Sequence, residues 1–300
     1  MAIPRIYRAQ DAAIALKSKG YERTLIIAYK ATLIDVQNSI AQAYTKLPKV
    51  GEANYFAEMA KYSRLANLES EITGEIAKLT GQTTRTITRA VEKQYGESYL
   101  RTGFILERET GAKLAFGILD KPAIQRAVEN PLDTVGFINR VKENQAVMVR
   151  QVREQLTRGL ISGDSYQQMA KRITDRFDVG ANKALTVVRT ETHRVVQKGR
   201  LDAFEQAASR GVILKRQWVS ATDSRTREDH GAADGQAVLM EEPFIVGGER
   251  LMYPGDPAGS PENVINCRCA TIGVIEGYEP NFTSVRHEHP ANYEEWLKQK

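Results

Sequence analysis

Hydrophobic residues recur every three or four positions through the first 210 or so residues of the chain, and polar residues fill the places between them. This spacing puts the apolar side chains on one face and is typical of amphipathic helices. The predicted long helices are residues 21–47, 54–79, 83–110, 135–160 and 181–209. We expect Gly81 to end the second of them as a C-terminal cap, and Gly211 to end the last.

Turn-forming residues predict shorter helices between these. Pro122 favours the first turn of a short helix, which residues 129–131 close. Asp164 or Ser165 can cap a further helix that runs to Phe177. The Asp-Val-Gly triplet at residues 178–180 is expected to break the helical pattern once more.

The pattern changes after Gly211. Residues 212–219, 244–246 and 270–275 combine β-branched and aromatic side chains, which predicts three strands separated by loops rich in glycine and proline. A polar tail follows, with a short helix expected near residues 293–298. The predicted fold class is therefore α+β, with a long-helix N-terminal region followed by a small, mixed, loop-rich C-terminal domain. The expected divisions are residues 1–180, 181–277 and 278–300.

Composition limits the classes of protein that fit. The 300 residues are 42% hydrophobic and 26% charged, as in globular proteins. No run approaches the ~20 apolar residues of a membrane span, the start lacks a signal-peptide core, and two cysteines make no disulfide framework. We therefore expect no membrane partner and a location in the cytoplasm where the chain is made. A net charge of +5 favours non-specific contact with DNA rather than sequence-specific binding.

Candidate chemistry is concentrated between Trp218 and Cys269, which holds both cysteines and one of the four histidines. Cys267 and Cys269 lie two residues apart, so both sulfurs face the same side if a strand begins at Cys267. Two thiolates suit a soft metal such as zinc, with His230 as a third ligand and Asp223 as a fourth. Two alternatives remain open at this stage, namely buried thiols that only pack, or a strained disulfide.

Charged residues precede His230 in the run Asp-Ser-Arg-Thr-Arg. Asp223 is expected to form an Asx-turn with its own backbone. Arg225 and Arg227 offer planar donors for carboxylates or phosphates, although a solvated loop with local ion pairs explains them equally well.

A second charged group lies on the last long helix, in the sequence Arg-Thr-Glu-Thr-His. Arg189 and His193 are four residues apart and share a face, whereas Glu191 lies on another. These residues form either an exposed helix surface or a cluster in which Arg189 turns inward toward the acidic loop downstream.

No nucleophile elbow, phosphate-binding loop, dinucleotide fingerprint or His-Glu-x-x-His motif is present in the sequence. A Cys267–His230 nucleophile pair and a metal-dependent nuclease built on Asp223 and His230 can both be imagined. No second, independent sequence feature supports either of them. The sequence therefore predicts a protein that is not an enzyme. Trp218, on a predicted strand, is expected in the core.

The order of these residues along the chain resembles the phage Mu F-type head morphogenesis family over roughly residues 181–275. The residues that carry this resemblance are Arg189, Glu191, Trp218, Asp223, Arg225, His230, Gly235, Pro254, Asn266, Cys267, Arg268 and Cys269. Members are minor head, or minor capsid, proteins of tailed phages and prophages. The resemblance implies a role in head assembly, a place in the virion after assembly in the host cytoplasm, and few copies per particle.

The same resemblance implies binding partners and a region of the chain that contacts them. The portal protein and other head or scaffold proteins are the expected partners, with residues 1–180 as the contact region. Some members are linked to DNA packaging or ejection, and the family domain also occurs joined to toxin domains.

The alternative function is a metal-assisted hydrolase of nucleic acid or peptidoglycan that uses Asp223, His230, Cys267 and Cys269.

The chain departs from a common form of the family pattern. Many members carry Cys-x-x-Cys where this chain has Arg227 to His230, and a histidine where it has Val264 or a neighbour. His230 can replace one ligand but Arg227 cannot replace the other. The resemblance thus leaves two readings, a zinc site or a hydrogen-bonded polar cluster. In the second, Arg225, Arg227 or Arg268 pairs with Asp223 or Glu191. No cofactor other than zinc is expected.

Overall fold

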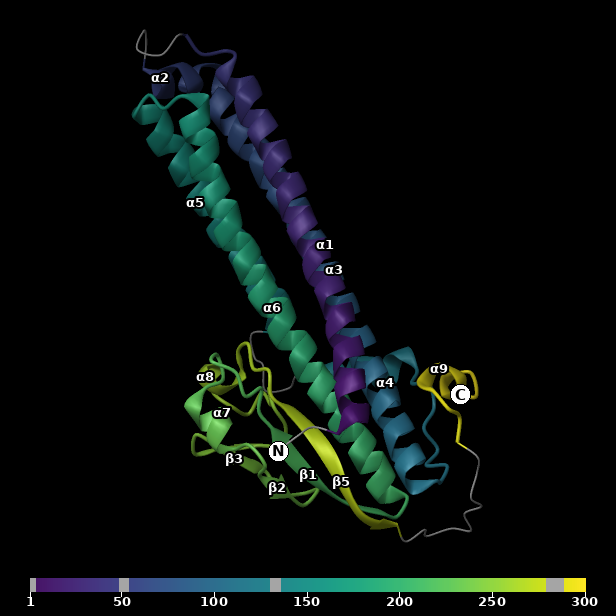
Figure 1. The fold of residues 1–300 in the computed structure, drawn as a ribbon. Helices are drawn as coiled ribbons and strands as arrows, with labels where there is room; N and C mark the ends of the chain where they lie inside the picture. The colour runs from purple at the N-terminus through teal and green to yellow at the C-terminus, as the bar shows by residue number, and fades with distance from the viewer. Residues whose placement is uncertain (1–3, 49–53, 130–135, 279–288) are drawn as a thin grey trace. The chain divides into compact units, whose positions relative to one another are not determined.

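The computed structural model describes residues 4–48, 54–129, 136–278 and 289–300. Its fold class is α+β, as the sequence predicts, with long helices followed by a small region of short antiparallel strands (Figure 1). The helices are α1 (Arg5–Tyr44), α2 (Tyr55–Ala60), the 3-10 helix η1 (Lys61–Ser63), α3 (Arg64–Thr110), α4 (Lys121–Val128), α5 (Gly136–Ile161), α6 (Tyr166–Ser209), α7 (Glu228–Ala232), α8 (Pro261–Val264) and α9 (Tyr293–Leu297). The strands are β1 (Val212–Val219), β2 (Ala237–Val238), β3 (Phe244–Val246), β4 (Glu249–Leu251) and β5 (Ala270–Tyr278).

Two predicted helix breaks are wrong. Helix α3 continues through Gly81, and α6 continues through residues 178–180. A glycine inside a helix costs about 1 kcal/mol relative to alanine, which the packing of a long helix readily offsets. Gly180 has a packing role instead, because a Cβ atom there would lie 2.5 Å from the Met148 sulfur.

Other predicted boundaries are confirmed. Helix α4 begins beside Pro122, with the Asp120 side chain accepting a hydrogen bond from the Ala123 N–H at 2.7 Å. Ser165 caps α6 and exchanges hydrogen bonds with Gln168. Residues 130, 131 and 135 of the predicted breaks lie outside the described residues.

The chain forms two compact units, each built from separate stretches of sequence. The first unit contains residues 1–19, 89–134 and 189–300, and the second contains residues 20–88 and 135–188. Helices α1, α3 and α6 therefore each supply one part to each unit. The predicted division of the chain into three consecutive modules, residues 1–180, 181–277 and 278–300, stays a prediction.

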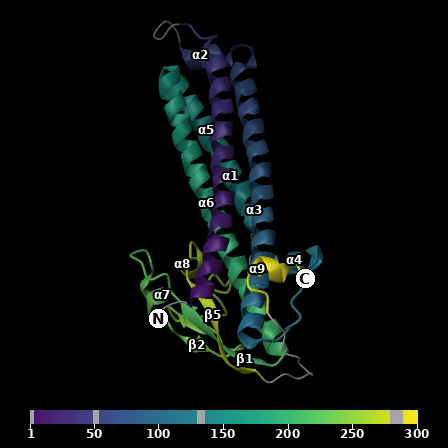
Figure 2. The same ribbon diagram turned by 45° about the vertical axis from the view of Figure 1, so that its right-hand side comes forward.

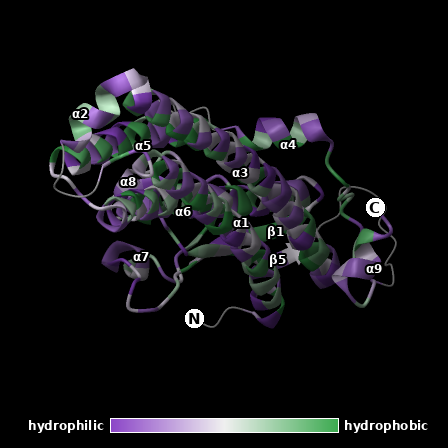
Figure 3. Ribbon diagram, turned by 90° about the horizontal axis from the view of Figure 1, so that it is seen from above, coloured by the Kyte–Doolittle hydropathy of each residue, from purple (hydrophilic) through white to green (hydrophobic). Residues whose placement is uncertain are grey.

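In the second unit, parts of α1, α3, α5 and α6 lie side by side (Figures 1 and 2). Apolar side chains from all four helices make one core, which includes Ile40, Ile76, Val152 and Phe177. Figure 3 shows that the long helices carry both hydrophobic and hydrophilic residues, as expected of amphipathic helices. Among the described residues, none of the helices combines the length and hydrophobicity that a membrane span requires.

In the first unit, the described strands include a three-stranded antiparallel sheet in the order β2-β1-β5. Strand β1 pairs with β5 from Val212 opposite Tyr278 to Val219 opposite Ala270. Strands β3 and β4 form a separate hairpin, closed by Gly247 and Gly248, which both have positive φ. All three predicted strands are confirmed, and β5 extends three residues further than predicted.

Among the described residues, two hydrophobic clusters hold the first unit together. The larger one joins β1 and β5 to parts of α3 and α6, and the short helix predicted near residue 293 docks on it as α9. The indole of Trp296 is buried there and donates a hydrogen bond to Glu107 at 2.6 Å. The smaller cluster surrounds Trp218 and contains both cysteines. It is the part of the fold that positions the candidate site.

In the first unit, α6 packs so closely against α3 at Gly199 that no room is left for a side chain. A Cβ atom at Gly199 would lie 2.6 Å from the backbone oxygen of Tyr95, and backbone cannot move aside as a side-chain tip can. We expect Gly199→Ala to lower the free energy of unfolding by about 1–3 kcal/mol. Gly74→Ala, at a helical position with nothing within 4 Å, is the matched control, and we expect it to stabilise by about 0.4–1 kcal/mol. Urea denaturation of both variants is the measurement, and equal effects would contradict the packing argument.

Candidate functional site

The two cysteines lie in the segment that leads into β5, not on the strand itself. The condition that a strand begins at Cys267 is not met, because β5 starts at Ala270, as predicted. Asn266 has a left-handed backbone with φ of 54°, and the Cys267 N–H bonds to the Val264 carbonyl at 3.2 Å. Asparagine tolerates this conformation better than most residues, so it can make the turn that carries both thiols inward.

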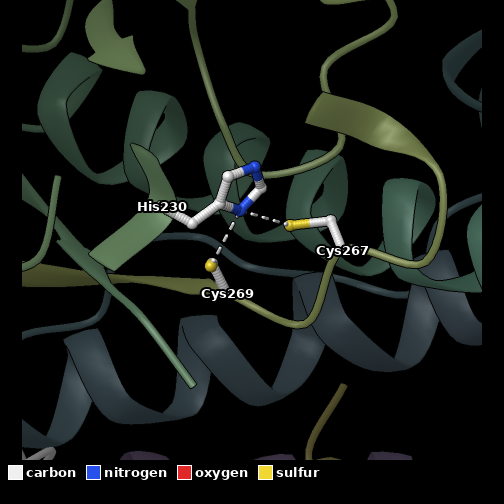
Figure 4. Close-up of side chains that lie close together, drawn as sticks. All are labelled: His230, Cys267 and Cys269. Carbon is white, nitrogen blue, oxygen red and sulfur yellow. Dashed lines mark hydrogen bonds between the residues drawn. The ribbon is translucent and has the colours of Figure 1, made fainter. Parts of the chain in front are cut away.

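His230 lies on α7 and meets both thiols (Figure 4). Its Nδ1 atom is 3.3 Å from the Cys269 sulfur and 3.6 Å from the Cys267 sulfur. All three residues are buried, and their three donor atoms lie within 4.8 Å of one another. The structure thus brings together three of the four side chains that the sequence proposed as metal ligands.

Asn263 fixes the orientation of the His230 ring. The Asn263 Oδ1 atom lies 3.2 Å from His230 Nε2, while Asn263 Nδ2 lies 3.4 Å from the Val246 carbonyl, which it can only meet as a donor. His230 therefore carries its proton on Nε2 and directs the Nδ1 lone pair at the two sulfurs. Histidines that bind metals are held in the same way, by a carbonyl or carboxylate on the far ring nitrogen.

The two thiols differ in acidity. A hydrogen bond from Cys269 lowers the pKa of the Cys267 thiol. The same hydrogen bond, together with burial, raises the pKa of Cys269 above its usual range. Cys267 is thus the first of the pair to become a thiolate, the form that binds metals. Nearby on α6, burial lowers the pKa of His193 to about 4.

Asp223, the fourth predicted ligand, does not join this cluster. Arg268 donates to both of its carboxylate oxygens, at 2.5 and 2.6 Å, in a planar two-point contact. This contact holds the pKa of Asp223 well below its usual range. The Arg225 N–H donates to Asp223 Oδ1 at 3.0 Å, which confirms the predicted Asx-turn. Asp223 shapes an exposed loop and is engaged by arginine.

The remaining charged residues of the motif are separate from the thiols. Arg227, which stands where many family members have a cysteine, donates to the Ile265 carbonyl at 2.5 Å. Glu191 is buried and pairs with Arg194 at 3.0 Å. Arg189 is exposed on α6, and the Arg225 side chain is 78% exposed. Arg227 and Arg268 therefore connect loops around the cluster, and neither belongs to it.

Other motif residues have a structural basis. Trp218 is fully buried and packs edge-on against His230 and Phe244, at ring distances of 5.8 and 5.4 Å. Gly235 has φ of 81°, and its N–H bonds to the Trp218 carbonyl at 2.9 Å. Pro254 precedes a glycine with φ of 83°, and the Asp256 N–H bonds to the Tyr253 carbonyl at 3.0 Å, the arrangement of a type II turn.

The donor set suits zinc. Two thiols and an imidazole are among its preferred ligands, and the second nitrogen of the imidazole is already fixed. A structural zinc site needs four donors, and this cluster supplies three. Sequence reasoning missed Asn263, because an isolated asparagine carries no signal of the ring that it will face.

Comparison with known proteins gives one family and several relatives. A family model described as phage Mu protein F like protein matches residues 150–272. The minor head protein of Bacillus phage SPP1 is 32% identical over an alignment of 288 positions that covers 93% of this chain and 92% of that protein. An NAD(+)–arginine ADP-ribosyltransferase of Enterococcus faecalis is 26% identical over 94% of this chain, but the chain spans only 58% of that enzyme. No solved structure matches.

Proposed function

The chain belongs to the phage Mu F-like family of minor head proteins, and from that premise we propose that it acts in assembly of the phage head, bound to the portal protein in few copies. The observation that carries the proposal is the similarity to a minor head protein over nearly the whole length of both chains. This similarity extends beyond the motif region into the long helices, so the helical part shares the relationship. In this proposal the chain assembles in the host cytoplasm and remains in the virion.

We place the portal contact on the helical residues 1–180. Support comes from α1, where Ile27 and Ile34 are 60% and 56% exposed. They are seven residues apart, so they project from the same face of the helix. Exposed apolar residues that share a face are typical of surfaces that another protein covers.

The role we propose is not enzymatic. The relative named as a transferase extends well beyond this chain, and about two fifths of it has no counterpart here. We therefore assign no transferase activity to the residues that the two proteins share.

The geometry does not favour the alternative of a metal-assisted hydrolase. Its carboxylate, Asp223, is engaged at both oxygens by Arg268. Both ring nitrogens of His230 have partners as well. A hydrolase of this kind needs a free base beside the metal, and this arrangement supplies none from the residues predicted for it.

Contact with packaged DNA remains part of the proposal. A groove along α5 is lined by four basic residues and one acidic residue, namely Lys142, Arg150, Arg153, Arg158 and Glu154. Phosphate contacts of lysine and arginine release counterions, so the affinity for DNA should fall steeply as salt rises. Absence of DNA binding at low salt would remove this part.

Co-purification tests the portal contact. The full chain and the portal protein encoded beside it are expressed together, treated with nuclease and purified, and the mass of the complex is determined. We expect a defined complex, and we expect Ile27→Glu with Ile34→Glu to abolish it. Ile245→Glu is the matched control, since Ile245 is 48% exposed on β3 and lies outside residues 1–180. Absence of a complex at every salt concentration would contradict the proposal.

A further inference from the structure

Among the residues that the structure describes, no fourth zinc donor joins the cluster of His230, Cys267 and Cys269, and Asp223 is held elsewhere. Helix α6 runs alongside the segment that carries both cysteines. Three of its side chains bond to that segment, and they mark which face of the helix lies against it. The identity of the residue between them on this face points to the missing donor.

Thr190 accepts a hydrogen bond from the Asn266 N–H at 3.2 Å, at the start of the cysteine segment. Gln197 accepts one from the Thr271 N–H at 3.1 Å, just beyond its end. Arg200 donates to the Thr271 carbonyl at 2.7 Å. These α6 residues follow helical spacing and form one stripe along residues 266–271.

His193 completes this stripe, three residues after Thr190 and four before Gln197. It lies about 4.5 Å along the helix axis from Thr190, at a rise of about 1.5 Å per residue, so it faces the middle of the cysteine segment. The charges of Cys269 and His230 both act on His193, which agrees with this position.

The Nε2 atom of His193 is buried and has no hydrogen-bond partner among the described residues. A buried polar atom without a partner costs about 1–3 kcal/mol, so its presence calls for an explanation. The adjacent ring carbon, Cδ2, lies against Gly255, where an added Cβ atom would be 3.2 Å away. The tight turn at Gly255 therefore encloses the same edge of the ring.

We propose that His193 supplies the fourth donor of a structural zinc site that it shares with His230 and the two cysteines. Its donor atom is not among the three within 4.8 Å of one another, so its ring, or the thiol segment, must shift when the metal binds. The site would join α6, α7 and the segment before β5, and with four protein donors it leaves no open position for substrate. This inference is independent of the proposed role in the head.

Metal analysis of the purified full chain tests the proposal. We expect one zinc per chain, and a cobalt-substituted form with the absorption of a tetrahedral site that contains thiolates. His193→Ala should weaken zinc binding at least 10-fold and alter the cobalt spectrum. Asp223→Ala is the matched control and should leave both unchanged. Zinc affinity and cobalt spectrum of His193→Ala that equal those of the unsubstituted chain would overturn the proposal, as would absence of zinc binding by the unsubstituted chain.

A second measurement avoids the risk that His193→Ala fails to fold. Nitrogen NMR of the imidazoles in the unsubstituted chain is recorded with and without zinc. We expect zinc to shift the resonances of His193 Nε2 and His230 Nδ1, whereas those of His289 stay in place. A shift confined to His230 would mean that another donor completes the site, and it would overturn the assignment of His193.

Discussion

Replacing Trp218 with alanine is expected to lower the free energy of unfolding by about 3–5 kcal/mol, the usual cost of removing a large aromatic side chain from a core. Trp218 is fully buried at the centre of the smaller cluster, between Phe244 and His230. Its backbone also pairs with Gly235 and Gln236. Since both cysteines belong to this cluster, we also expect the thiols to become more reactive toward alkylating reagents.

Ile213→Ala is the matched control for Trp218→Ala. Ile213 is on the same strand but is 44% exposed, so its loss should cost about 1 kcal/mol or less. Urea denaturation followed by circular dichroism compares the variants without using tryptophan fluorescence. A Trp218→Ala protein as stable as the unsubstituted chain would mean that the packing around β1 is described wrongly.

Arg216→Met is expected to lower the free energy of unfolding by a similar amount, about 3–5 kcal/mol, because it removes the donor of three charge-assisted hydrogen bonds, each of which contributes about 1.5–3 kcal/mol. The Arg216 side chain is buried, and its guanidinium donates to the carbonyls of Leu239, Glu242 and Met252. Its carbon centre also lies 5.2 Å from the centroid of the Phe244 ring. Methionine fills part of the space but leaves three carbonyls without their donor.

Lys215→Met controls for the loss of a positive charge on β1. Lys215 is the preceding residue, points to the other face, and pairs with Glu276 at 2.7 Å where both side chains are exposed. A surface pair of this kind contributes about 0–1 kcal/mol. Urea denaturation of the two variants separates the roles, and equal losses would show that the Arg216 contacts contribute little.

The strands could be predicted from the sequence because local signals agree there. The stretches that form β1 and β3 are rich in β-branched and aromatic residues, and glycines adjoin both. The helix breaks at Gly81 and residues 178–180 were predicted wrongly because the same local signal, a glycine, was overridden by packing. The neighbour that explains Gly180 is Met148, on another helix. Assembly of the compact units from separate stretches depends on such distant contacts too.

The candidate site could be predicted in part. Residue type and spacing were enough to group His230 with the two cysteines. They could not show that Arg268 engages Asp223, because a two-point ion pair depends on the path of the loop between them. The position of His193 beside the cysteine segment became visible only through the contacts of Thr190 and Gln197.

We propose that this chain is a component of the phage head. Quantitative mass spectrometry of purified, DNA-filled heads from the phage that carries this gene tests it most directly, with the portal protein as the internal standard. We expect the chain to be present at a fixed ratio to the portal protein, and in far fewer copies than the major capsid protein. Heads that assemble and fill with DNA but contain none of the chain would contradict it.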